Sequence, residues 1–191
     1  MFRSILLMAS IFLIYAFFNS EKTDISKQAE STEEAVKVDT RDFPDRFQII
    51  PGDEVINYRS AQPTLEQLQA MIGQLKIEVV IRLNGNEGGL NIDQEKAFCE
   101  RNKIQFVRLN AHLSENGPGY DASGKVASTI LRDGNVLIHC QHGYDRVGAL
   151  VGYWLKENGL SRSQIIEHND WDGYLEKKGE SYREYWNTIS D

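Results

Sequence analysis

The amino-acid sequence predicts an α/β fold, a single domain with a largely parallel central sheet flanked by helices. From residue 47 onward, short runs rich in β-branched residues alternate with helical stretches, and this alternation is typical of a parallel sheet. The chain has 191 residues, which suits one compact domain with modest extensions. Its hydrophobic content of 41% and charged content of 26% are those of a globular protein, so collagen-like and wholly disordered classes are excluded.

Residue type and turn signals predict the first eight elements of this domain. β-branched residues mark the strands, most clearly in the run IEVVIRL at 77–83, and Gly, Pro and Asn mark the turns. Thr64 and Gln67 have capping-box spacing and begin the first helix. In chain order, the predicted elements are strands at 47–50 and 55–58, a helix at 65–75, a strand at 77–83, a helix at 93–102, a strand at 104–109, a helix at 123–132 and a strand at 135–139.

Hydrophobic periodicity predicts the helix that Arg146 opens. Five apolar residues recur at i, i+3, i+4, i+7 and i+8, so they share one helix face: Val147, Leu150, Val151, Trp154 and Leu155. Ser161 and Gln164 repeat the capping-box spacing and predict a further helix. The remaining residues predict a C-terminal helix that covers the sheet with its aromatic side chains, Tyr174, Tyr182 and Trp186.

Residues 1–20 are predicted to be a signal peptide or an N-terminal anchor. Arg3 precedes an apolar run from Ile5 to Phe18, which is shorter than the ~20 residues of a typical membrane span. Phe17 and Phe18 stand where a cleavage site has small residues, so cleavage and membrane tethering both stay open. Residues 21–40 are predicted to be a disordered linker and 41–191 the folded domain. We therefore expect an extracytoplasmic protein, periplasmic or secreted.

The charge and the cysteine count exclude several classes of partner and cofactor. A formal net charge of −7 argues against general nucleic-acid binding, which needs a basic surface. This charge does not exclude a small positive pocket for a phosphorylated substrate. Two cysteines are too few for a disulfide scaffold or a four-thiolate zinc site. No two histidines have metal-ligand spacing, so neither a metal nor another cofactor is predicted.

The segment HCQHGYDR at 139–146 joins the last strand to the following helix and carries the predicted chemistry. A tight loop entering a helix points its backbone N–H groups inward, and the helix dipole adds partial positive charge, so this loop suits a phosphate group. The same field favours a thiolate on Cys140. Arg146 is placed to bind two phosphate oxygens, which a lysine does less well. Gly143 allows a left-handed backbone angle.

These residue types assign a role to each position of the segment. Cys140 is the predicted nucleophile, and His139, at the strand end, is a supporting residue that braces the loop and stabilises the thiolate. The predicted substrate-binding residues are Gln141, His142, Gly143, Tyr144, Asp145 and Arg146. The loop would thus bind a phosphate group and present a nucleophile to the phosphorus atom.

The His-Cys-x5-Arg loop resembles that of the cysteine-dependent phosphatases, the protein tyrosine and dual-specificity phosphatase superfamily. Its form, His-Cys-x-x-Gly-x-Asp-Arg-x-Gly, and the upstream run YRSAQP at 58–63 are similar to the bacterial dual-specificity-like branch. The resemblance covers roughly residues 47–186. It implies a tyrosine-phosphatase-like fold, attack by Cys140, a cysteinyl-phosphate intermediate, hydrolysis by water and no metal.

Two positions depart from the family's pattern. Val147 stands where the family has Ser or Thr, whose hydroxyl assists the leaving thiolate, so slower turnover is expected. The family also places an acidic residue upstream of the Cys, but this chain has Leu109-Asn110 at that point. The alternatives for the general acid are Asp145, Glu115 and Asp121. We favour Asp145, because some branches of the superfamily with an Asp-Arg pair use the Asp in the loop.

The sequence favours an exported phosphate monoesterase. Its expected substrate is either an inositol polyphosphate-type small molecule or a phosphotyrosine or phosphoserine/threonine protein, since some members with the same loop are phytases. Two other functions remain open: a pseudophosphatase that binds phosphorylated partners without turnover, and a rhodanese-type sulfurtransferase. Cys99 is interpreted as a small buried hydrophobe, with a reversible disulfide to Cys140 as the alternative. His168 is interpreted as a surface histidine.

Overall fold

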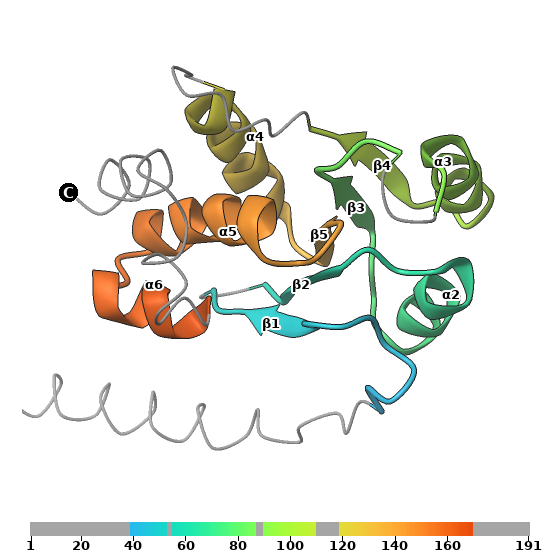
Figure 1. Cartoon of the computed structure of the whole chain (residues 1–191), viewed down its shortest axis with the longest axis horizontal. Helices are drawn as coiled ribbons and strands as arrows, with labels where there is room; N and C mark the ends of the chain where they lie inside the picture. Colours follow the sequence, from blue (N-terminus) through green and yellow to red (C-terminus); the bar gives the residue numbers. More distant parts are fainter. Residues whose placement is uncertain (1–38, 53–54, 87–89, 110–118, 170–191) are drawn as a thin grey trace, which may run out of the picture. The chain divides into compact units, whose positions relative to one another are not determined.

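A computed structural model of the chain describes residues 39–52, 55–86, 90–109 and 119–169 (Figure 1). Within these residues, five strands form one sheet in the order β1-β2-β5-β3-β4. The strands are β1 (Gln48–Ile50), β2 (Asn57–Ala61), β3 (Val79–Arg82), β4 (Gln105–Arg108) and β5 (Val136–Cys140). β1 pairs antiparallel with β2, and every other neighbouring pair is parallel. The predicted largely parallel sheet is therefore confirmed.

Helices cover both faces of this sheet. They are α2 (Leu65–Gln74), α3 (Ile92–Arg101), α4 (Gly119–Asp133), α5 (Asp145–Glu157) and α6 (Arg162–His168). α2 and α3 lie on one side of the sheet, and α4, α5 and α6 lie on the other (Figure 1). Right-handed crossovers explain this division, because the chain moves outward from β2 to β3 and β4 through α2 and α3 and returns to β5 through α4.

The central strand β5 and helix α5 provide most of the core. β5 is buried over its whole length. The five apolar residues predicted to share one face of α5 are all buried and belong to the main hydrophobic cluster: Val147, Leu150, Val151, Trp154 and Leu155. This packing fixes the start of α5 against the carboxyl end of β5, where ligands bind in parallel α/β folds.

Two predicted elements differ from the structure by more than two residues at one end. The second strand was predicted at 55–58 but spans Asn57–Ala61, and it buries three polar side chains, Asn57, Arg59 and Ser60. A strand with polar residues buried at successive positions has no hydrophobic pattern to mark it. The Asn57 amide is satisfied there, since it donates to the Leu131 carbonyl at 2.9 Å and accepts from the Val136 N–H at 3.1 Å. α4 begins at Gly119, four residues before the predicted start at Ser123. The prediction places the start too late because Gly119 follows a proline, and glycine next to proline is typical of a loop.

Some predictions concern parts of the chain outside the described residues. These parts include the N-terminal signal or anchor segment, the linker up to residue 38, and the C-terminal helix with Tyr174, Tyr182 and Trp186. Among the helices in the described ranges, none combines the length and apolar character that a membrane crossing requires.

Candidate active site

The predicted phosphate loop lies at the junction of β5 and α5. β5 ends at Cys140 and α5 begins at Asp145, so residues 141–144 form the tight connection expected from the sequence. Cys140 is 3% exposed and is paired in the parallel register with Ala61 at the end of β2. The sulfur-bearing residue therefore sits at the carboxyl end of the central strand, beside the segment YRSAQP.

Gly143 packs directly against β2 with a left-handed backbone. Its φ angle is +66°, as the sequence predicted for this glycine. A Cβ atom at this position would lie 2.4 Å from the Ala61 nitrogen and 2.6 Å from the Ser60 carbonyl carbon. These atoms are backbone and cannot move aside without shifting the strand. Only glycine fits here, and the loop conformation is tied to the position of β2.

Replacing Gly143 with alanine should therefore disrupt the loop. We expect the free energy of unfolding to fall by about 2–4 kcal/mol, since left-handed strain adds to the overlap with β2. Gly159→Ala is the matched control, because Gly159 has a φ of +79° and a Cβ added there would meet no described atom within 4 Å. That control should lose only about 1 kcal/mol. Urea denaturation measures both changes, and equal losses would contradict the close contact between the loop and β2.

The N-cap residue of α5 is not one of the usual capping residues. Tyr144 is the N-cap residue and its side chain makes no capping hydrogen bond. Thr64, Asn91 and Ser161, by contrast, cap α2, α3 and α6. Uncapped N–H groups at a helix N-terminus attract an anion. The N-terminus of α5 adjoins the strand end that carries Cys140.

The remaining residues of the loop differ in how far they are exposed to solvent. Arg146 is in the first turn of α5 and is partly buried, as are Gln141, Tyr144 and Asp145, while His142 is exposed. The Gly148 N–H donates to the Tyr144 carbonyl at 2.8 Å and closes the first turn. The roles predicted for these residues in phosphate binding stay predictions.

Arg59 of β2 connects the loop to α6. It is 2% exposed. Its Nη2 donates to the Gly143 carbonyl at 3.0 Å, and its Nη1 donates to the Oδ1 of Asn169, the residue that ends α6. Burial lowers the pKa of Arg59 to about 10, with the charge of Cys140 acting in the opposite direction. Arg59 therefore remains a cation at neutral pH, beside the loop.

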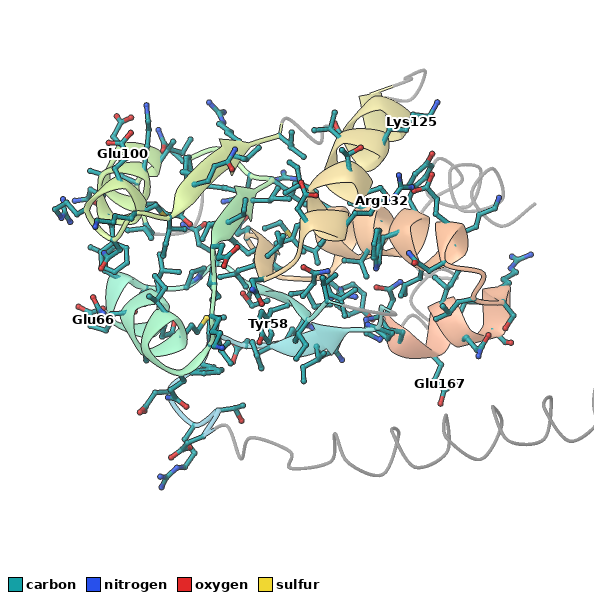
Figure 2. All side chains as sticks on the ribbon, turned by 180° about the vertical axis from the view of Figure 1, so that it is seen from behind. Tyr58, Glu66, Glu100, Lys125, Arg132 and Glu167 are labelled. Carbon is teal, nitrogen blue, oxygen red and sulfur yellow. The ribbon has the colours of Figure 1, made fainter. Side chains whose placement is uncertain are left out.

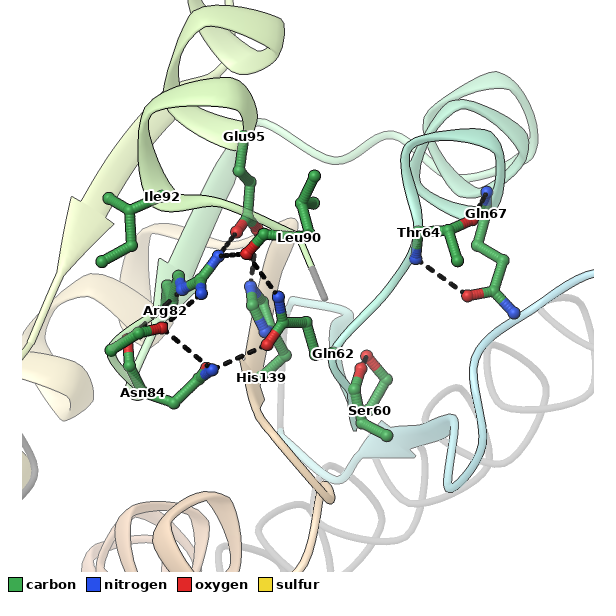
Figure 3. A network of polar contacts seen from close by, with 12 residues as sticks. Ser60, Gln62, Thr64, Gln67, Arg82, Asn84, Leu90, Ile92, Glu95 and His139 are labelled. Carbon is green, nitrogen blue, oxygen red and sulfur yellow. Dashed lines mark hydrogen bonds and ion pairs between the residues drawn. The ribbon is translucent and has the colours of Figure 1, made fainter. Parts of the chain in front are cut away.

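A buried charge network supports His139 from the other side. The Glu95 carboxylate of α3 contacts the His139 Nε2 at 2.7 Å and the Arg82 Nη1 at 2.6 Å, and all three side chains are inaccessible to solvent (Figure 3). Burial raises the pKa of Glu95, but the charges and hydrogen bonds of His139 and Arg82 outweigh it and hold that pKa below its ordinary value. Glu95 is therefore ionised at neutral pH and fixes the imidazole next to Cys140.

The same network reaches the loop backbone through Gln62. Arg82 also donates to the carbonyl oxygens of Leu90, Asn84 and Gly85. The Gln62 side chain donates to the Leu90 carbonyl at 2.8 Å and accepts from the Asn84 amide at 2.7 Å (Figure 3). The Gln62 N–H in turn approaches the Gln141 carbonyl at 3.4 Å. Both ends of the loop segment 139–141 are thus held by neighbouring strands and turns.

Arg46 lies over the outer part of the loop. Its guanidinium carbon is 4.0 Å from the centre of the Tyr144 ring, a distance typical of a cation–π contact. The backbone of Arg46 is left-handed, with a φ of +57°. The preceding carbonyl, that of Asp45, accepts a hydrogen bond from the Ala61 N–H at 2.8 Å, and Phe47 stacks on Tyr58. A second cation is therefore fixed beside the loop.

Three other predictions can be compared with the structure. Cys99 is fully buried, as expected, and burial with the charges of Glu95 and Glu100 raises its pKa to about 12. Cys99 and Cys140 are both free thiols here. His168 is not a surface residue as interpreted: it is partly buried, and burial together with the charge of Arg59 lowers its pKa to about 4.

The predicted alternatives for the general acid are not all within the described part of the chain. Glu115 lies outside the described residues, and Asp121 falls in α4 at a position whose side chain is not described. Val147 is fully buried in the core, and its hydrocarbon side chain has no hydroxyl to offer the loop. Among the described residues, no group of three or more His, Cys, Asp or Glu side chains is arranged to hold a metal ion.

Sequence reasoning missed three residues that support the loop. The sequence assigns Arg59 no role beyond its place in the run YRSAQP, and it assigns none to Arg82 or Glu95. Each is a charged residue on a strand or helix that the fold buries completely or almost so. A signal was present in Arg82, since an arginine inside a strand predicted to lie in the sheet needs a partner. Arg59 carried no such signal, because the predicted strand ends at residue 58.

Comparison with solved structures identifies the fold. No family model and no curated protein matches the chain. A DUF442 protein from Shewanella putrefaciens, described as a candidate phosphatase, has 16% identity and a TM-score of 0.60, and the match covers 78% of this chain and 90% of that one. The catalytic domain of the PP-IP phosphatase Siw14 from S. cerevisiae has 20% identity and a TM-score of 0.57, covering 78% and 87%.

A third structure, a candidate phosphatase from Neisseria meningitidis, has 21% identity and a TM-score of 0.53, and the match covers 72% of this chain and 94% of that one. At these identities, the similarity establishes the fold. The chain therefore has the fold of the cysteine-based tyrosine and dual-specificity phosphatases, as its loop motif predicted.

Proposed function

We propose, from this fold and from the loop it carries, that the chain is a cysteine-dependent phosphatase that hydrolyses phosphate monoesters. One observation carries the proposal: Cys140 ends the central strand just before the N-terminus of α5, and the cationic Arg59 donates to the loop between them. Such a site attracts a phosphate dianion and holds a sulfur nucleophile beneath it. The proposed location outside the cytoplasm rests on the sequence of residues 1–20 alone.

The proposed reaction has two steps. The Cys140 thiolate attacks phosphorus, a sulfur–phosphorus bond forms and the bond from phosphorus to the leaving oxygen breaks, while Asp145 gives that oxygen a proton. Water then attacks phosphorus and gives a proton to Asp145, and the thiolate leaves. Arg146 and the N–H groups of the loop stabilise the charge on the phosphoryl oxygens in both steps. Val147 offers the departing thiolate no hydrogen bond, so the second step is expected to be the slower one.

Phosphate release from the purified full-length protein tests this proposal. Aryl phosphate, a phosphotyrosine peptide and inositol hexakisphosphate would be compared at one enzyme concentration. We expect release from at least the aryl phosphate. Binding of these compounds without release would instead support the pseudophosphatase, and sulfur transfer from thiosulfate to cyanide would support the sulfurtransferase.

Among the substrates, the site favours a small molecule with several phosphate groups. Arg46 places a second cation on the ring of Tyr144, two residues before Arg146. An aryl monophosphate has no second phosphate to offer this cation, whereas a further phosphate on the same molecule would bind it. The structural neighbour Siw14 is a PP-IP phosphatase, which agrees with this choice.

Arg46→Ala should therefore change selectivity more than catalysis. We expect kcat/KM for inositol hexakisphosphate to fall about 10-fold, the effect of losing one charge-assisted contact, while that for aryl phosphate changes less than about 2-fold. Lys103→Ala is the matched control, because Lys103 is also an exposed cation with a left-handed φ, of +60°. Lys103 precedes β4, at the opposite end of the strands from the loop. Equal losses on both substrates would refute the proposed contact.

A further inference from the structure

The end of α6 is joined to the loop by one buried side chain. The Arg59 Nη2 donates to the Gly143 carbonyl at 3.0 Å, across 84 residues, and its Nη1 donates to the Asn169 Oδ1, across 110 residues. Arg59 and Asn169 are each 2% exposed, so water hardly competes for these bonds. A guanidinium is planar and holds its donors in a fixed fork. This rigid group therefore fixes the loop carbonyl relative to the end of α6.

α6 holds Asn169 in place without help from Arg59. The Ser161 side chain caps the start of the helix. Ile165 is 1% exposed and belongs to the main hydrophobic cluster. The Asn169 N–H donates to the Ile165 carbonyl at 3.1 Å and ends the helix. The Asn169 side chain is therefore a fixed acceptor for the guanidinium.

Arg59 closes a circuit of elements around the loop. The loop leads into α5, and the Leu160 N–H donates to the Leu155 carbonyl at 3.0 Å, which fixes the turn from α5 to α6. Residues two apart on a strand point to the same face, so Arg59 lies on the same face as Ala61, the strand neighbour of Cys140. From this face the guanidinium connects the end of α6 back to the loop.

We propose that Asn169, which lies outside the His-Cys-x5-Arg segment, is a positioning residue for the loop and acts through Arg59. The proposal rests on the proposed function, because it assigns a role at the same site. In a trans peptide the carbonyl and the next N–H point in opposite directions. A Gly143 carbonyl held by Arg59 therefore turns the Tyr144 N–H away from Arg59. If this peptide turned round, its carbonyl oxygen would repel a bound phosphate, so Asn169 keeps the loop ready for an anion.

A double-mutant cycle tests the link. Asn169→Ala removes the acceptor, and Arg59→Lys keeps the charge but loses the planar fork. We expect each substitution to raise the dissociation constant of inorganic phosphate, measured by calorimetry, about 5-fold, the scale of one hydrogen bond. The double variant should bind phosphate no more weakly than either single variant, because both substitutions break the same link. Independent losses, about 25-fold in the double variant, would overturn the proposal.

Asn158→Ala is the matched control. Asn158 ends α5 as Asn169 ends α6, and its side chain donates to the Trp154 carbonyl of its own helix at 2.7 Å. We expect this variant to lose stability in urea but to change the dissociation constant of phosphate less than about 2-fold. Equal losses of phosphate affinity in Asn158→Ala and Asn169→Ala would show that Asn169 acts through general stability alone, and would contradict the proposal.

Two measurements on the full-length protein without ligand separate this proposal from the proposed function. The amide resonance of Tyr144 should shift in Asn169→Ala and in Arg59→Lys but not in Asn158→Ala, and an unshifted resonance would contradict the link. If the variants do not fold, the wild type still gives an answer. Its Arg59 Nη protons are buried and hydrogen-bonded, so they should exchange slowly with water, and rapid exchange would contradict the proposal. Both results can be read even if the protein releases no phosphate.

Discussion

Replacing Cys140 with serine should abolish phosphate release while leaving phosphate binding in place. A hydroxyl is a far weaker nucleophile than a thiolate at neutral pH, because it stays protonated. We expect kcat to fall by about 10⁴-fold or more, the scale on which removal of a covalent nucleophile acts. The backbone N–H groups of the loop and the guanidinium of Arg146 remain, so the dissociation constant for inorganic phosphate should change little.

The other cysteine supplies the control for this experiment. Cys99 is fully buried on α3, and burial raises its pKa to about 12, so it stays a thiol. Cys99→Ser should keep most of the activity even if it lowers stability. Initial rates of phosphate release and calorimetric phosphate binding compare the two variants. Substantial turnover in Cys140→Ser would remove Cys140 as the nucleophile.

Replacing Glu95 with glutamine should destabilise the fold by about 3 kcal/mol or more. Glu95 is inaccessible to solvent and contacts both Arg82 and His139. Losing its charge leaves the Arg82 guanidinium buried without a counter-charge, and breaking one side of a buried ion pair costs about 3–5 kcal/mol. Because His139 precedes Cys140, activity should fall as well.

Glu100→Gln is the matched control on the same helix. Glu100 points away from the core on the outer face of α3 (Figure 2) and pairs with Lys96 at 3.8 Å, with both side chains exposed. Exposed pairs of this kind contribute about 0–0.5 kcal/mol. Urea denaturation at neutral pH measures both variants. Similar unfolding free energies for Glu95→Gln and Glu100→Gln would contradict a structural role for the buried network.

The pH dependence of this contribution has a definite sign. The pKa of Glu95 is lowered in the folded state from its ordinary value of 4.5. Its stabilising effect is therefore fully present above the ordinary value and is lost as pH falls through the lower, folded value. The difference in unfolding free energy between the wild type and Glu95→Gln should accordingly shrink under acidic conditions.

The loop could be predicted from the sequence because its chemistry is local. Cys140, Gly143 and Arg146 stand within one short segment, and both the strand before it and the helix after it have clear patterns. The left-handed backbone of Gly143 and a helix that opens at Arg146 followed from those patterns, and α5 begins one residue earlier, at Asp145. The buried face of α5 could also be predicted, because five apolar residues recur with a spacing that fits a helix and not a strand.

The residues that support the loop could not be found in this way. Arg59 contacts a carbonyl 84 residues away, and Glu95 contacts His139 across 44 residues. No local pattern separates a buried Glu95 from an exposed Glu100 five positions later on the same helix, since both are acidic residues in a polar stretch. Only the order of the strands brings β2, β3 and β5 together. The polar strand β2 was misplaced for the same reason.

The central claim is that Cys140 forms a covalent bond to phosphorus during turnover. Rapid acid quenching of the full-length protein with aryl phosphate, followed by peptide mass spectrometry, tests it most directly. We expect one added phosphoryl group on the peptide that carries Cys140, and none in Cys140→Ser. Phosphate release with the phosphoryl group on another residue, or steady turnover with Cys140 never modified, would contradict the claim.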